Sequence, residues 1–95
     1  MDADLKDVRR IIRDRLDAEW PQLRIIDVVV RAEGDQDGEP VLTVNLIFKG
    51  KSPNVDAAMD AVDRLHPAIW DAFEAFPVFS FIAEKEASSL RRGAR

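Results

Sequence analysis

The chain has 95 residues, of which 46% are hydrophobic and 34% charged, with a formal net charge of −4 and no cysteine. A chain of this length is expected to form one domain that buries about two-thirds of its unfolded surface, so its core needs no metal or disulfide. The lack of cysteine excludes disulfides and thiolate chemistry, as is typical of intracellular proteins, and the acidic balance argues against a domain-wide electrostatic grip on nucleic acid.

Residues 2–20 are predicted to form an amphipathic helix. Apolar side chains recur at helical spacing from Leu5 to Leu16, and Pro21 closes the segment. The opposite face is basic, and it is either solvated or used to contact phosphates or an acidic protein surface. The cations concerned are Lys6, Arg9, Arg10 and Arg13, joined in the tail by Arg91, Arg92 and Arg95.

Two strands are predicted next, over residues 25–33 and 41–48, because the hydrophobic period changes to two. In the first strand Ile26 is assigned to the core face and Ile25 to the opposite face. The acidic segment 34–40 between the strands contains part of a calcium-loop pattern. It lacks the third aspartate and the bidentate glutamate of that pattern, so we interpret it as a hairpin turn.

A second helix is predicted after the segment GKSPN, with Ser52 as a candidate N-cap and Pro53 at the first helical position. One apolar stripe then runs from Val55 to Phe73, on both sides of Pro67. A proline inside a helix removes a backbone hydrogen bond, so the helix is expected to bend at Pro67 or to be divided there.

The only histidine, His66, lies in this stripe next to the proline. A side chain that titrates near neutral pH is a natural candidate for a general base or a metal ligand. No second histidine accompanies it, and the nearest carboxylates, Asp60 and Asp63, are also ordinary helix-surface residues. We therefore predict a packed or capping histidine, and no catalytic residue, metal or cofactor.

A third strand is predicted where FPVFSFIA alternates after the helix. The predicted fold is an α+β two-layer sandwich of order α-β-β-α-β, with a three-stranded sheet, helices on one face and the second helix kinked at Pro67. Residues 1–86 form the domain and residues 87–95 a flexible basic tail. Since no signal peptide or membrane-spanning run is found, a cytoplasmic location is expected.

The second face of this sheet is more apolar than an open face should be. If both helices cover the first face, the second should meet water, yet aliphatic residues on all three strands would exceed the apolar patch that a monomer normally exposes. We predict a non-enzymatic protein-binding or assembly module, homodimeric through this face or covered by another protein. Alternatively these are ordinary strand residues with partial cover from the C-terminal tail. The predicted interface residues are Ile25, Val29, Val41, Thr43, Ile47, Val78, Ser80 and Ile82.

Two other classes of function stay open. If Pro67 divides the second helix, the order α-β-β-α-α-β resembles, over residues 2–84, the type II KH fold, including ribosome-binding factors of that topology. Domains of this family hold a nucleic-acid backbone with a G-x-x-G loop, whereas this chain has LHPA at the helix joint. The resemblance implies an RNA- or ribosome-associated protein that uses the basic helix face and the tail. A small enzyme or ligand carrier would instead need a deep pocket near His66 and Trp70.

Overall fold

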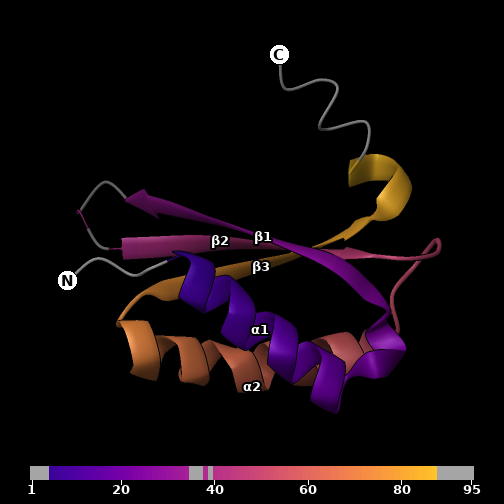
Figure 1. Cartoon of the computed structure of the whole chain (residues 1–95), viewed down its shortest axis with the longest axis horizontal. Coiled ribbons are helices and arrows are strands. Elements are labelled where there is room, and N and C mark those ends of the chain that lie inside the picture. The colour runs from indigo at the N-terminus through magenta and orange to yellow at the C-terminus, as the bar shows by residue number, and fades with distance from the viewer. Residues whose placement is uncertain (1–4, 35–37, 39, 88–95) are drawn as a thin grey trace.

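The computed structural model describes residues 5–34, 38 and 40–87, and it confirms the predicted α-β-β-α-β order. Both helices lie on one side of a three-stranded sheet (Figure 1). Residues 84–87 form a helical turn directly after the last strand. The elements are α1 (Leu5–Glu19), the 3-10 turn η1 (Pro21–Leu23), β1 (Ile25–Gly34), β2 (Pro40–Phe48), α2 (Val55–Phe73) and β3 (Phe76–Ala83).

The central strand of the sheet is β2. It pairs antiparallel with β1 and parallel with β3, in the order β1-β2-β3. A parallel pair cannot be closed by a tight turn, and α2 supplies the crossover that connects β2 to β3. Both β1 and β3 are therefore edge strands. Most of the turn between β1 and β2, residues 35–37 and 39, lies outside the described residues, as does the tail from residue 88.

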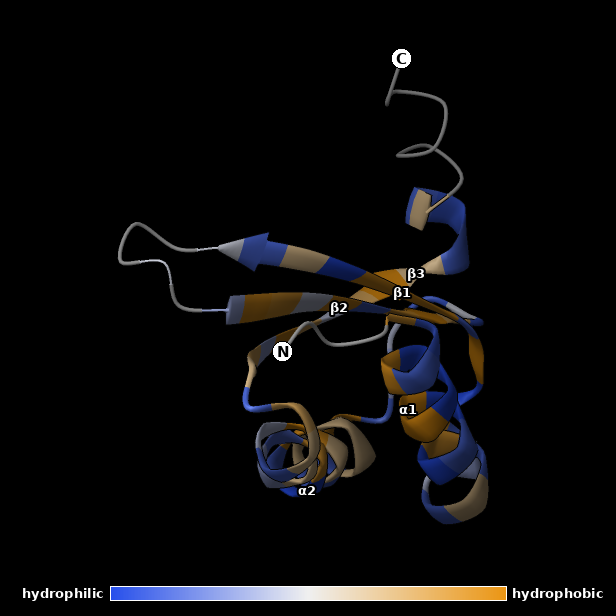
Figure 2. Cartoon of the chain, turned by 60° about the vertical axis from the view of Figure 1, so that its left-hand side comes forward, coloured by the Kyte–Doolittle hydropathy of each residue, from blue (hydrophilic) through white to orange (hydrophobic). Residues whose placement is uncertain are grey.

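The helix α1 is amphipathic, as its sequence period predicts. Val8, Ile12 and Leu16 are buried, and the ribbon of α1 alternates hydrophobic and hydrophilic segments (Figure 2). Figure 2 also shows α2 almost end-on, on the same side of the sheet as α1. The helix ends before Pro21, whose missing N–H is tolerated at the start of η1.

The helix α2 is a single helix that contains Pro67. Its N-cap is Asn54, whose Oδ1 accepts a hydrogen bond from the backbone N–H of Ala57 at 3.1 Å. The predicted cap, Ser52, is therefore wrong by two residues. Because α2 is not divided, the order α-β-β-α-α-β that resembles the type II KH fold does not occur.

The core lies between the helices and the sheet. Leu65 and Ile69 of α2, together with Val44 and Leu46 of β2, expose no surface. Full burial of side chains of this size stabilises the fold by about 1.5–3 kcal/mol each. The same cluster includes side chains of α1, so a single core joins α1, α2 and the sheet.

The strand β1 is irregular at its start. Ile25 pairs with Phe48, whereas Asp27 pairs with Ile47, which leaves Ile26 as an extra residue. As a result Ile25 packs against the core and Ile26 is 38% exposed. The prediction that Ile26 faces the core and Ile25 the opposite face is wrong, because a bulge shifts the alternation by one residue.

Candidate functional site

The candidate site is the face of the sheet that α1 and α2 leave uncovered, called the open face below. Side chains that pair across strands share a face, so the pairing arranges the open face in rows of three. Seven of the eight predicted interface residues lie in these rows, and Ile25 does not. The rows are Glu33, Val41 and Phe76; Arg31, Thr43 and Val78; Val29, Asn45 and Ser80; and Asp27, Ile47 and Ile82.

One end of the open face is apolar and accessible. Phe76 is 49% exposed and Val78 44% exposed, and Val41, which pairs with Phe76, is partly exposed. The ring of Phe76 also meets the ring of His66 edge-on, with 4.9 Å between the centroids. Because His66 belongs to α2, on the covered side of the sheet (Figure 1), this contact places the ring of Phe76 at the edge of the open face rather than over it.

The other end of the open face is covered by the chain itself. Ile47 is only 5% exposed and Ala87 only 6%. Figure 1 shows the helical turn after β3 on the side of the sheet opposite to α1 and α2. The prediction of Ile47 as an accessible interface residue is therefore wrong. The alternative of partial cover from the C-terminal tail concerns residues that, from 88 on, lie outside the described ones.

The middle rows of the open face are mixed, with four polar side chains beside Val29 and Val78. Asn45 and Ser80 lie beside one another on β2 and β3. In the neighbouring row, the hydroxyl of Thr43 donates a hydrogen bond to Oε2 of Glu33 at 3.1 Å. Arg31 is exposed and forms no ion pair within the described residues. This middle zone can form hydrogen bonds and ion pairs with a partner, but it does not demand apolar cover.

The basic face of α1 is engaged with the free edge of β1. Nε of Arg9 donates to the carbonyl oxygen of Val28 at 2.8 Å, and its Nη2 donates to Oδ1 of Asp27 at 3.1 Å. Nη1 of Arg13 donates to the carbonyl oxygen of Ile26 at 3.3 Å. An edge strand presents backbone groups without strand partners, and these two arginines occupy part of that edge.

The remaining predicted phosphate-contact residues give no cluster on the described chain. Arg10 pairs with Asp7 of its own helix at 2.8 Å, and Lys6 is exposed. Arg91 and Arg92 lie outside the described residues. All four basic side chains predicted on α1 therefore have interaction partners of their own rather than standing free for nucleic acid.

A buried indole links the junction between α1 and η1 to α2. The N–H of Trp20 donates to Oδ2 of Asp60 at 2.9 Å, and Nε of Arg64 donates to Oδ1 of the same carboxylate at 3.1 Å. The pKa of Asp60 lies below its ordinary value of 3.8. The main cause is the hydrogen bond from Trp20, and the hydrogen bond from Arg64 is the second. Both carboxylate oxygens of Asp60 thus accept hydrogen bonds within the protein, so Asp60 is not a candidate to bind a metal ion together with His66.

Two further properties of the described residues bear on function. They contain no group of three or more histidine, cysteine or acidic side chains placed to hold a metal ion. None of the helices in the described ranges combines the length and apolar character needed to cross a bilayer.

The fold is similar to that of two solved structures, both of the putative zinc transporter CzrB. The zinc form aligns with a TM-score of 0.63 and 20% sequence identity over 86% of each chain. The other structure aligns with a TM-score of 0.61 and 20% identity over 83% of this chain and 90% of that one. No model of a protein family and no curated protein sequence match the chain. At this identity the similarity establishes a shared fold.

Proposed function

We propose that this chain is a non-enzymatic assembly module that forms a homodimer through the open face of its sheet. The observation that carries the proposal is the accessible apolar pair Val41 and Val78 at one end of that face, with Phe76 beside them at its edge. Solvent-exposed apolar side chains that lie side by side are typical of interaction surfaces. The similarity to CzrB, a putative transporter rather than an enzyme by its name, supports a role outside catalysis.

The charges beside the apolar group favour a second copy of the chain as the partner. In a two-fold interface the same surface meets itself, so any charge on it needs a partner of opposite sign on that same surface. On the open face, β1 presents Arg31 and, two residues later, Glu33, and both are exposed. With the strands of two copies antiparallel across the interface, Arg31 of each copy can pair with Glu33 of the other.

The test is the mass in solution of the parent chain and of the double variant Val41→Lys, Val78→Lys. We expect the parent to scatter light as twice 10.7 kDa and the variant as a monomer. An ammonium group buried without a partner costs several kcal/mol, so the dissociation constant should rise by about 100-fold or more.

The matched control is Val55→Lys, Met59→Lys on α2, where the parent side chains are 63% and 62% exposed and lie off the open face. This variant should remain dimeric. Urea unfolding should show that both variants fold. A monomeric parent, or a control that dissociates as readily as the open-face variant, would overturn the proposal.

A further inference from the structure

A second surface lies at one end of the molecule, where the segment around η1 meets the connection from β2 to α2. There a cleft of about 410 Å³ opens between the two segments and is called the basic cleft below. No acidic side chain lines it. The polar and charged residues that line it are Gln22, Arg24, Lys49, Lys51, Ser52 and Asn54.

The backbone fixes the two walls of the basic cleft. The N–H of Lys49 donates to the carbonyl oxygen of Arg24 at 3.1 Å, which ties the walls together. Arg24 has a φ of 55°, and Gly50 has a φ of 104°, a conformation that glycine adopts readily. This turn at Gly50 places Lys49 and Lys51 on the lining of one cleft with Arg24.

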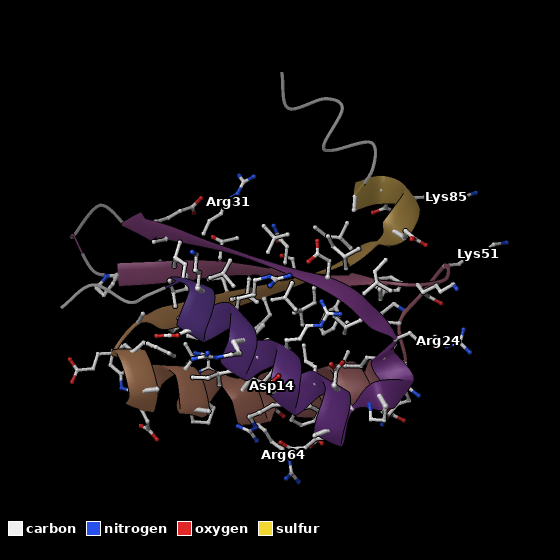
Figure 3. All side chains as sticks on the ribbon, in the orientation of Figure 1. Asp14, Arg24, Arg31, Lys51, Arg64 and Lys85 are labelled. Atoms are coloured by element: carbon white, nitrogen blue, oxygen red, sulfur yellow. The ribbon has the colours of Figure 1, made fainter. Side chains whose placement is uncertain are left out.

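The cations of the basic cleft are not neutralised by the chain. Most arginines of the described residues pair with acidic side chains, five of them at distances of 2.8–3.8 Å. Three of the five described cations without an ion pair line this one cleft, in a chain whose net charge is −4. Figure 3 shows Arg24 and Lys51 projecting from the same end of the molecule. The five cations without an ion pair within the described residues are Arg24, Arg31, Lys49, Lys51 and Lys85.

We propose that the basic cleft binds the diphosphate group of a small molecule. The cleft gathers three positive charges without an acidic side chain, and an anion with several charges can interact with all of them at once. The guanidinium of Arg24 can bind two phosphate oxygens at once, and the lysines add charge. Ser52 and Gln22 supply neutral donors, whereas the side chain of Asn54 already caps α2. The volume is within the usual range for small-ligand sites, roughly 300–1,000 Å³.

The phosphates, rather than an attached ring, carry this recognition. No aromatic side chain lines the basic cleft, and its apolar wall consists of Leu23 and Pro53. A nucleobase would therefore find no stacking partner there. None of the lining residues belongs to the rows of the open face, so this site and the proposed dimer can be tested separately.

The experiment is a calorimetric titration of the folded chain with sodium diphosphate at low ionic strength. The double variant Lys49→Gln, Lys51→Gln should bind at least about tenfold more weakly, because it loses two charge-assisted contacts. The control Arg10→Gln, Lys85→Gln removes the same charge from cations outside both the cleft and the rows of the open face, and its affinity should change by less than about twofold. Binding should weaken as salt is added.

Several results would overturn the proposal. One is a parent chain that shows no saturable diphosphate binding, and another is an equal loss of affinity in the control variant. A single-stranded RNA oligonucleotide that binds more tightly than diphosphate, and loses this advantage in the cleft variant, would instead make the cleft part of a nucleic-acid surface. Urea unfolding of each variant shows whether a loss of binding is a loss of folding.

Discussion

At the scale of single residues, the contact between Trp20 and Asp60 links α2 to the segment that follows α1. Trp20 is only 3% exposed, and a buried indole N–H usually requires an acceptor. Asp60 supplies that acceptor across 40 positions of sequence. Arg15 lies over the indole ring at 5.8 Å. The carboxylate therefore stabilises the packing of the tryptophan as well as the surface of its own helix.

The lowered pKa of Asp60 predicts a specific pH dependence. A carboxyl group whose pKa is lower in the folded than in the unfolded state stabilises the fold above the unfolded value, about 3.9. This contribution disappears as the pH falls through the lower, folded value. The difference in unfolding free energy between the parent and Asp60→Asn should therefore shrink between about pH 6 and pH 3 in urea titrations. Asp63→Asn removes one charge from the same helix, and an equally large trend in that variant would contradict the assignment.

At the scale of elements, the two edges of the sheet differ. Arg9 and Arg13 cover carbonyl groups of β1, whereas no side chain in the described ranges forms a hydrogen bond with the backbone of β3. The sequence shows the basic face of α1, but the function of that face depends on how α1 crosses the sheet. A helical period carries no information on that crossing, so a solvated face and an edge-covering face have the same pattern.

Removing the guanidinium of Arg9 should destabilise the protein more than removing that of its neighbour Arg10. Arg9→Ala leaves the carbonyl of Val28 without its partner, and we expect a loss of about 1–2 kcal/mol in urea unfolding. Arg10 pairs with Asp7 on the exposed surface of its own helix, so Arg10→Ala should cost less than about 0.5 kcal/mol. Equal effects of the two substitutions would show that the edge contact contributes nothing of its own.

The proline inside α2 makes a second prediction at this scale. Pro67 cannot donate a hydrogen bond to the carbonyl of Asp63, and its ring crowds that carbonyl. Because Pro67 is exposed, Pro67→Ala should stabilise the protein by about 1–3 kcal/mol, measured as an increase in the free energy of unfolding. Ala68→Gly, a helix-weakening change at the next position, should act in the opposite direction. A destabilised Pro67→Ala variant would mean that packing of the proline ring stabilises the fold more than the regained backbone hydrogen bond does.

Most elements could be predicted from the sequence because periodicity is a strong local signal. The helices and strands follow the spacing of their apolar residues. The bulge at Ile26 could not be predicted, since Ile25 and Ile26 are chemically identical and either satisfies a period of two. The helix cap was ambiguous for a similar reason, because Ser52 and Asn54 are both good capping residues and the path of the loop decides between them.

At the scale of the whole molecule, the sequence predicts which side chains lie on the open face, but not how much of that face is accessible. The alternation of residues identified the side chains that turn away from the helices, and the pairing of strands places seven of them together. The burial of Ile47 depends on the helical turn after β3, which has no strong sequence pattern. The basic cleft was not predicted, because Arg24 is separated from Lys49 and Lys51 by two strands and only the folded chain brings them together.

The central position of β2 has a consequence for how the protein is made. Of the two strands that pair with β2, β1 precedes it in the sequence and β3 follows it. The strand β3 comes only after the whole of α2. A nascent chain can close the β1-β2 hairpin early, whereas the second edge of β2 stays bare until residues 76–83 have left the ribosome. Unpaired edges of this kind promote aggregation. The strand β3, which is synthesised after β1 and β2, is therefore the one that protects the second edge of β2.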